Sequence, residues 1–438
     1  MMSMRILFLA TTAFLFACSS GDPNTTDAGN DVVPDAAPNY TCTQDPKAFW
    51  TWDLSIMPPK DVQRQATCQG QSDHAYVYVD DDVWNAGTMT PDQVTNILDA
   101  FEKHTPRDAT RGSYAMDTQT FGDPPDVDGD PHVYLFYTAL GVFQGQRFDG
   151  FFRDIDESAS DPHSNHLEML HMDPTGPSAA DSDYMLGIII HEFVHLINYV
   201  YDNGDEGWLS ESLAESAMAL GGYLTDVPTA QSYVKIMSGV PLCVSGYSDY
   251  GATFSWGAYM LDRFGAGFLK SVLQDKAHGI AGITKYLNGE TFQDAFGEFA
   301  VAASIDQHAI GDGRYGYVSA QLGALGKETG GVTDGAPHDQ NVDVWAARAV
   351  RLTPPSGKTS LAITMASTNL ANLRVYTFTF DPNSPSTGTV TPQTGASFSV
   401  PIAAGQVVDL IVAVTSSASI PQLQGAPVTT FTYSATPQ

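Results

Sequence analysis

The stretch that most constrains the fold lies at residues 188–218 and reads IIIHEFVHLINYVYDNGDEGWLSESLAESAM. On a helix, residues i and i+4 share one face, so His191 and His195 can bind one ion, with Glu192 on the adjacent side. The rest of the run is apolar, and burying three polar side chains without partners is costly. The pattern therefore predicts a core helix with the geometry of an HExxH zinc site.

A catalytic zinc needs a third protein ligand and keeps one position for water. One known solution places a glycine and a third histidine at fixed spacing after the second histidine, but here Asn198 and Tyr201 occupy those places. A turn at residues 202–205 leads instead into a second predicted helix, which carries Glu211 and Glu215 on one face. Such a turn can bring that face back against the histidines, so we expect a helix pair around a metal.

The order HEFVH, then Trp208-Leu209-Ser210-Glu211, then Ala214-Glu215, resembles the gluzincin pattern of HExxH followed by WLxExxAE. Within the gluzincins, roughly residues 70–305 are similar to hyicolysin-like peptidases and other secreted bacterial metalloproteases. The spacing between the second histidine and the first glutamate is shorter here than in thermolysin and the aminopeptidase branch. The resemblance implies a gluzincin-type fold and zinc-dependent peptide hydrolysis.

The resemblance also implies roles for individual residues. Zinc would be held by His191, His195 and Glu211. Glu192 would be the general base, because zinc lowers the pKa of its bound water to about 7 and a neighbouring carboxylate can take the proton. Glu215 lies one turn past Glu211 and is placed to orient a ligand histidine through its other ring nitrogen. The two glutamates can still exchange these roles at this point.

Attack of water on a peptide carbonyl creates an oxyanion, which needs a hydrogen-bond donor besides the metal. Tyr250, in SDYGATF just ahead of a predicted helix, is the first candidate, and Tyr247 is the second. The alternative is that Tyr250 only packs at the start of its helix.

The loop DPPDVDGD at residues 123–130 places Asp126, Asp128 and Asp130 at alternate positions around Gly129. This spacing is typical of the start of a calcium-binding loop, but the closing glutamate of an EF-hand is missing. The loop therefore predicts either a calcium site or an acidic turn before a strand.

The N-terminus has the features of a secretion signal, with Arg5 followed by an apolar run too short to span a membrane. Its end, Leu-Phe-Ala-Cys18, resembles the lipobox of bacterial lipoproteins. We therefore expect a lipoprotein signal peptide over residues 1–18, with lipidation of Cys18, and a polar, disordered linker over residues 19–45. A plain signal peptide is the alternative. Either way the protein is exported, to the outer membrane or cell surface of a bacterium or to the extracellular space.

Export to an oxidising compartment favours one disulfide among Cys42, Cys68 and Cys243. We favour Cys42–Cys68, which ties the start of the folded part to itself, although sequence alone does not determine connectivity. Cys243 is then a buried thiol, or it is the true partner of one of the other two.

Charge and composition change near residue 341. Before that point lie 47 of the 50 acidic and 16 of the 20 basic residues. After it, short β-branched and aromatic runs alternate with Pro, Gly, Ser and Asn, which predicts an accessory β-sandwich over residues 341–438. The formal charge of −30 argues against nucleic acid or anionic membrane surfaces as partners.

Ahead of the histidine motif, HAYVYVDDDVW, PHVYLFYTAL and NHLEMLHMD read as strands, and TPDQVTNILDAFEKH reads as a helix capped by Thr90 and Asp92. Residues 184–303 are mainly helical in pattern. Strands followed by helices predict an α+β class for the catalytic domain, which we place at residues 46–335.

These features together predict a secreted, lipid-anchored zinc endopeptidase with a protein or peptide substrate. We expect an endopeptidase because no acidic amine-binding motif precedes the site, as an aminopeptidase would need. The alternative is a surface adhesion or carbohydrate-binding protein in which the sandwich is the active part. An intact HEFVH with Glu211 argues against that alternative, because a carrier domain needs no general base.

Overall fold

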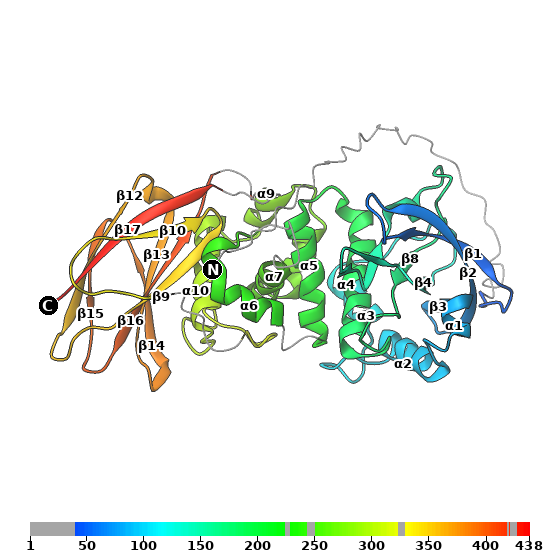
Figure 1. Cartoon of the computed structure of the whole chain (residues 1–438), viewed down its shortest axis with the longest axis horizontal. Coiled ribbons are helices and arrows are strands. Elements are labelled where there is room, and N and C mark those ends of the chain that lie inside the picture. The colour runs from blue at the N-terminus through cyan, green and yellow to red at the C-terminus, as the bar shows by residue number, and fades with distance from the viewer. Residues whose placement is uncertain (1–39, 224–227, 243–249, 323–328, 418–419, 421–426) are drawn as a thin grey trace, which may run out of the picture. The chain divides into compact units, whose positions relative to one another are not determined.

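The computed structural model describes residues 40–223, 228–242, 250–322, 329–417, 420 and 427–438 (Figure 1). Residues from Thr41 to Gln438 form one compact unit. Cys18, Cys243, Tyr247 and most of the expected linker lie outside the described residues. No helix within the described ranges is both long and apolar enough to cross a membrane.

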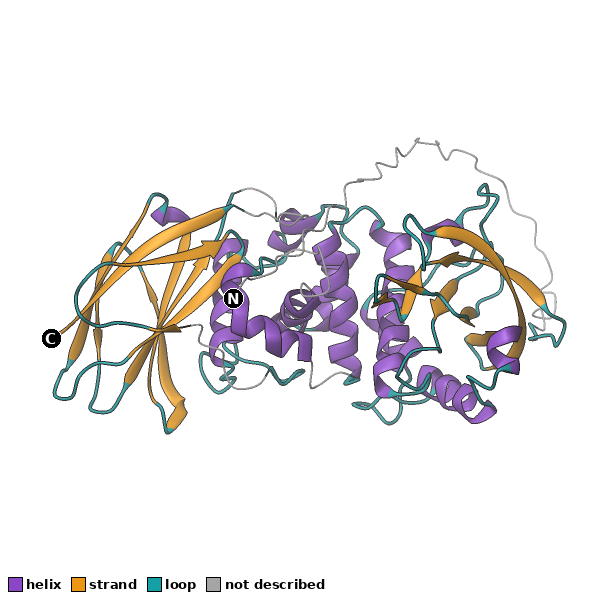
Figure 2. Ribbon diagram, in the orientation of Figure 1, coloured by secondary structure: helices purple, strands orange, loops and turns teal. Residues whose placement is uncertain are grey.

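The first part of this unit contains a six-stranded sheet (Figure 2). Its strands, in spatial order, are β1 (Lys47–Asp53), β2 (Lys60–Gln71), β3 (Ala75–Asp80), β4 (Val133–Tyr137), β8 (Met169–Met172) and β7 (Gly150–Phe152). β3, β4 and β8 run parallel to one another, and the other neighbours are antiparallel. Every residue of β3, β4 and β8 is buried, as expected for parallel strands covered on both faces. These are the three strands that the sequence predicted.

Short elements connect these strands. They are α1 (Asp81–Asn85), α2 (Pro91–Glu102), α3 (Ser113–Thr120), the paired β5 (Val142–Phe143) and β6 (Gln146–Arg147), and the 3-10 helix η1 (Asp154–Glu157). The prediction for α2 and for a cap at Thr90 is confirmed, while the second residue of the cap is Gln93 and not Asp92. Thr90 Oγ1 accepts a hydrogen bond from Gln93 N–H at 3.4 Å, and the Gln93 side chain accepts one from Thr90 N–H at 3.0 Å. This reciprocal capping box satisfies two donors that the helix end leaves unpaired.

Helices follow the sheet, as predicted for residues 184–303. They are α4 (Asp183–Asp202), α5 (Gly207–Gly221), α6 (Pro228–Ile236), the 3-10 helix η2 (Met237–Gly239), α7 (Tyr250–Phe264), α8 (Ala266–Leu273), α9 (Gly279–Thr284) and α10 (Phe292–Ile305). α4 and α5 pack side by side (Figure 1). α5 and α7 approach so closely that a Cβ at Gly257 would lie 2.2 Å from the backbone oxygen of Ser212. The α+β class is therefore confirmed, while a gluzincin-type arrangement stays a prediction.

Two further sheets share one hydrophobic core and form the predicted sandwich. One sheet has the order β10 (His338–Asp343), β17 (Val428–Pro437), β12 (Ser360–Ser367), β15 (Ser397–Pro401). The other has the order β14 (Ser384–Gln393), β13 (Leu373–Asp381), β16 (Val407–Val414), β11 (Ala346–Leu352), β9 (Thr329–Gly330). The sandwich therefore starts before the predicted residue 341, because β9 already pairs with β11. The sequence did not indicate β9, since two residues are too few to give a periodic pattern.

The sandwich is not packed independently of the helices. Phe292 and Phe296 of α10 contact the fully buried Trp345 ring, with centroids 5.3 and 5.4 Å apart. Arg374 of β13 pairs with Asp294 of α10, with Nε and Oδ1 2.5 Å apart. One hydrophobic core therefore extends from the helices into one face of the five-stranded sheet.

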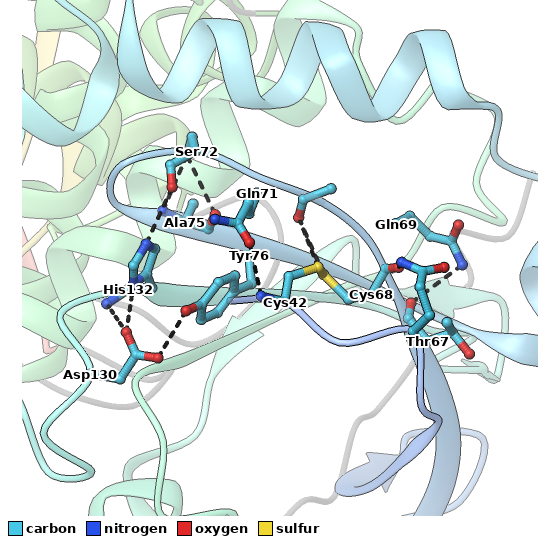
Figure 3. The surroundings of a disulfide bond; sticks show 12 residues. Cys42, Thr67, Cys68, Gln69, Gln71, Ser72, Ala75, Tyr76, Asp130 and His132 are labelled. Carbon is cyan, nitrogen blue, oxygen red and sulfur yellow. Dashed lines mark hydrogen bonds and ion pairs between the residues drawn. A yellow bond between two sulfur atoms is a disulfide. The ribbon is translucent and has the colours of Figure 1, made fainter. Parts of the chain in front are cut away.

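The expected disulfide joins Cys42 to Cys68 on β2 (Figure 3). Cys42 N–H also donates a hydrogen bond to Gln71 Oε1 at 2.8 Å, and the Gln44 side-chain amide donates one to Cys68 O at 2.9 Å. The prediction of a disordered linker up to residue 45 is therefore wrong at its end. A covalent bond and two hydrogen bonds hold residues 42–44 against β2, although their composition resembles that of the preceding polar residues.

Candidate metal site

The histidine pair lies in the middle of α4, away from either fraying end. The helix begins after Ser182, whose hydroxyl accepts a hydrogen bond from Met185 N–H at 3.4 Å. His191 and Glu192 are only 6% and 8% exposed. His195, one turn later, is partly exposed. The helix therefore fixes three polar side chains at the edge of an apolar core.

α5 brings Glu211 to the two imidazoles. The Nε2 atoms of His191 and His195 are 3.2 Å apart, and Glu211 Oε2 lies 3.3 Å from the first and 3.9 Å from the second. Around a tetrahedral zinc ion with ordinary zinc–nitrogen and zinc–oxygen bond lengths, any two ligand atoms lie about 3.3–3.5 Å apart. Two nitrogens and one carboxylate oxygen are also a donor set that zinc prefers. The three predicted ligands therefore fit a zinc ion.

The other ring nitrogens face groups of α5. Ser210 Oγ lies 3.2 Å from His195 Nδ1, and Glu215 Oε1 lies 4.0 Å from His191 Nδ1. Such outer contacts orient the rings that hold a metal. The geometry separates the two glutamates, since Glu211 faces Nε2 of both rings and Glu215 faces Nδ1 of His191. Ser210 was missed in the sequence, where it occupies the variable position of WLxE.

Glu192 is held from outside the helix pair. Its Oε2 accepts a hydrogen bond from Phe152 N–H of β7 at 2.8 Å. β7 can come this close because it begins with Gly150, where a Cβ would lie 2.9 Å from Ile188 Cγ2 of α4. One carboxylate oxygen of Glu192 is thus fixed by a backbone donor of an edge strand.

Charges at the site are strongly coupled. Burial opposes protonation of His191, but its contact with Glu211 and the charges of Glu192 and Glu215 raise its pKa to about 9. Burial lowers the pKa of His195. Burial also raises the pKa of Glu215 to about 7, whereas contacts with the two rings outweigh burial at Glu211 and lower its pKa. Three carboxylates around two imidazoles therefore favour added positive charge, as a proton or as a metal ion.

Tyr250 is the first residue of α7 and belongs to this electrostatic environment. The charge of Glu211 raises its phenol pKa most, followed by burial and by the charges of Glu192 and Glu215. The phenol therefore lies near the three carboxylates and keeps its proton. The second candidate, Tyr247, lies outside the described residues.

The predicted calcium ligands are only partly brought together. Asp126 and Asp128 join Glu168, with one oxygen of each carboxylate within 4.8 Å of the others. Asp130 does not belong to this group, and its inclusion in the prediction was wrong. The chain turns at Gly129, with φ of 79°, and Asp130 instead accepts a hydrogen bond from Tyr76 Oη at 2.9 Å (Figure 3).

Glu168 was missed, although the sequence holds a signal for it. It directly precedes β8, and the aspartate loop precedes β4. β4 and β8 are parallel neighbours, so their first residues meet at the same edge of the sheet. An acidic residue before each of two such strands is a cue for a shared site.

Comparisons with known proteins leave the chain without an assigned family. No protein-family model matches it, and no curated protein matches its sequence. Two solved structures of PliG, a periplasmic inhibitor of g-type lysozyme, are similar to 25% of this chain. The Aeromonas hydrophila protein matches over 94% of its length, with 8% identity and a TM-score of 0.18. The Salmonella Typhimurium protein matches over 98%, with 9% identity and a TM-score of 0.16.

A GH115 4-O-methyl-α-glucuronidase, BtGH115A, is similar to 82% of this chain over 57% of its own length, with 9% identity and a TM-score of 0.13. Similarities this weak carry no argument about fold or activity. The resemblance of the motif to hyicolysin-like gluzincins therefore stays a prediction.

Proposed function

We propose that this protein is a zinc-dependent endopeptidase of gluzincin type. The observation that supports this most is the convergence of three ligand atoms, His191 Nε2, His195 Nε2 and Glu211 Oε2, at separations of 3.2–3.9 Å. A zinc ion bound there would supply a water of lowered pKa and would polarise the scissile carbonyl.

Glu192 is the general base in this proposal. It accepts the proton of the attacking water and then delivers it to the leaving amine, as a carboxylate in this position can. Its Oε2 is held by Phe152 N–H, which limits the carboxylate to one orientation. A general base held in this way needs no reorientation when the substrate arrives.

Tyr250 is the proposed donor to the oxyanion. Its phenol keeps its proton beside the carboxylates of Glu211, Glu192 and Glu215, because a phenolate there would add a fourth negative charge. A protonated phenol can donate a hydrogen bond to the negative oxygen that forms when water attacks the carbonyl.

The strand β7 supports a peptide as the substrate. It ends the six-stranded sheet, so one of its edges pairs with β8 and the other pairs with no strand in the described part of the chain. Phe152 N–H points from that second edge to Glu192. An extended peptide can add to such an edge by backbone hydrogen bonds, and it would then lie beside the general base.

Export and lipid anchoring through Cys18 remain part of the proposal. The disulfide between Cys42 and Cys68 supports export, since structural disulfides persist in oxidising compartments. The rival function as a carbohydrate-binding protein gains no comparable support. The hollow of about 520 Å³ on the sandwich includes Thr377, Thr391 and Gln393, and none of its described lining residues is aromatic.

The proposal is tested by zinc analysis of the purified protein together with digestion of casein. We expect about one zinc per chain. Hydrolysis should stop when a chelator removes the zinc and should return when zinc is added. Hydrolysis that continues after the zinc has been removed would contradict the proposal, as would full zinc occupancy without cleavage of casein or of an unstructured peptide.

A further inference from the structure

Three acidic segments meet at the edge of the six-stranded sheet where β4 and β8 begin. Asp126 and Asp128 lie in the loop ahead of β4, and Glu168 directly precedes β8. One carboxylate oxygen of each lies within 4.8 Å of the others. The third segment is η1, which ends with Glu157.

Two glutamates at this edge are buried, and among the described residues three of their four carboxylate oxygens have no hydrogen-bond partner. Glu157 and Glu168 are only 6% and 2% exposed. Within the described residues, neither oxygen of Glu157 and only one oxygen of Glu168 has a hydrogen-bond partner, which is the backbone N–H of Val127. Buried carboxylates are otherwise paired with hydrogen-bond donors, basic side chains or metal ions. Across the described ranges, no ion pair links either glutamate to a basic residue.

The four carboxylates share one electrostatic environment. Burial, followed by the charges of Glu168, Asp156 and Asp128, raises the pKa of Glu157 to about 9. Burial also raises the pKa of Glu168 to about 7, with contributions from Asp128 and Asp126. The backbone also connects η1 to this group, because Asp156 O accepts a hydrogen bond from Leu167 N–H at 3.2 Å, so the residue before Glu157 lies against the residue before Glu168.

We propose that Asp126, Asp128, Glu157 and Glu168 bind a calcium ion. All four donors are carboxylates, which suit hard cations, whereas sites for zinc and copper include nitrogen or sulfur ligands. Calcium accepts six to eight oxygens in flexible geometry, so two exposed aspartates and two buried glutamates can be completed by backbone oxygens or water. Magnesium demands a near-ideal octahedron and keeps most of its own water, which makes it the weaker candidate.

The ion would connect segments that are far apart in the sequence. It would tie the loop before β4 to the start of β8 and to η1, which follows β7 after Arg153. Arg153 is fully buried, and its guanidinium pairs with Asp156 of η1 at 2.8 Å. Calcium would therefore stabilise the turn that leads out of β7. This inference stands on residues other than the zinc ligands and does not depend on the peptidase proposal.

The test uses the protein passed over a chelating resin and reloaded with one equivalent of zinc. Its thermal unfolding is followed as calcium chloride is added, with magnesium chloride in parallel, and calcium binding is measured by titration calorimetry. Extracellular calcium sites have Kd values of roughly 10⁻⁴–10⁻³ M. At about 10 mM calcium, such a site would shift the folding equilibrium roughly 10- to 100-fold toward the native state.

Four variants locate the site. Glu157→Gln and Glu168→Gln should fold, because each replaces a buried carboxyl group by a neutral amide of nearly the same size, but both should lose the response to calcium. Asp154→Asn removes an exposed carboxylate from the same 3-10 turn and should keep the response. Asp130→Asn should also keep it, since Asp130 is directed to Tyr76.

Two results would overturn the inference. One is a parent protein that neither binds calcium nor gains stability at about 10 mM, where a typical extracellular site would be occupied. The other is a Glu157→Gln variant that responds to calcium as the parent does, since the ligand set would then lie elsewhere.

Discussion

Replacing Glu192 by Gln separates its proposed role as a base from its role in packing. The parent carboxylate accepts Phe152 N–H at 2.8 Å on Oε2. In the variant, the amide oxygen must take that position, because the amide nitrogen would place two donors face to face. The NH₂ group is then directed to the position from which the parent carboxylate would take the proton, and it cannot accept one. The substitution thus removes the base while the local hydrogen bond is kept.

The expected magnitudes differ for activity and for folding. Loss of a general base lowers the rate by about 10²–10⁴-fold, which corresponds to about 3–5 kcal/mol in the barrier. Folding should change by no more than about 1 kcal/mol, because one hydrogen bond to a charged group becomes a neutral one. Zinc occupancy should stay near that of the parent, since the three proposed ligands are untouched.

The assay compares hydrolysis of a quenched peptide, zinc per chain and thermal unfolding for the parent and Glu192→Gln. Glu290→Gln serves as the control, because it makes the same chemical change at a residue that pairs with Arg263 away from the histidines. Hydrolysis by Glu192→Gln at the parent rate would refute the assignment of the base. Loss of zinc in that variant would instead make Glu192 a ligand.

The remaining predictions concern the ligands, the sandwich and the anchor. Glu211→Gln should lower zinc occupancy and activity together, whereas Glu215→Gln should reduce zinc affinity or rate only about 10- to 100-fold. Both variants are compared by zinc analysis after identical dialysis. If Glu215→Gln loses zinc and Glu211→Gln keeps it, Glu215 is the ligand instead of Glu211. Ser210→Ala removes the hydroxyl 3.2 Å from a ring nitrogen of His195 and should weaken zinc binding about tenfold, measured by competition with a chelating dye. Ser271→Ala serves as the control, because it removes a hydroxyl whose hydrogen bond to Gly267 O on α8 is exposed. A chain ending at Gly335 should fail to fold cooperatively, because it exposes the apolar face of α10; a sharp thermal transition near the parent temperature would contradict this. Cys18→Ser should release the protein from membranes in a fractionation experiment, and continued membrane partitioning would place the anchor elsewhere.

Local patterns with a strong physical basis were predictable from the sequence. The capped helix α2, the three buried strands and the long helix that carries His191 and His195 each follow from periodicity or capping. The turn between the two helices predicted that the face with Glu211 and Glu215 returns to those histidines, and the resemblance to gluzincins favoured Glu211 as the ligand. Cys42–Cys68 followed from the position of the first cysteine relative to the folded part.

Features that depend on tertiary contacts were not predictable in the same way. Whether Asp130 or Glu168 joins Asp126 depends on a positive φ at Gly129 and on which strands become parallel neighbours. The contact between Ser210 and the ring of His195 depends on the rotation of α5 against α4. The shared packing of the sandwich and α10 arises from aromatic contacts such as that of Phe292 with Trp345, and composition alone cannot reveal these contacts.

The disulfide at Cys42 has a mechanical consequence. β1 is the outermost strand of its sheet, so a pull on the chain ahead of it would otherwise unzip its hydrogen bonds to β2 one after another. The bond to Cys68 lies ahead of β1 and passes that load directly to β2, which is paired on both sides. A protein tethered by its N-terminus would therefore carry tension on an interior strand, and its edge would stay closed under load.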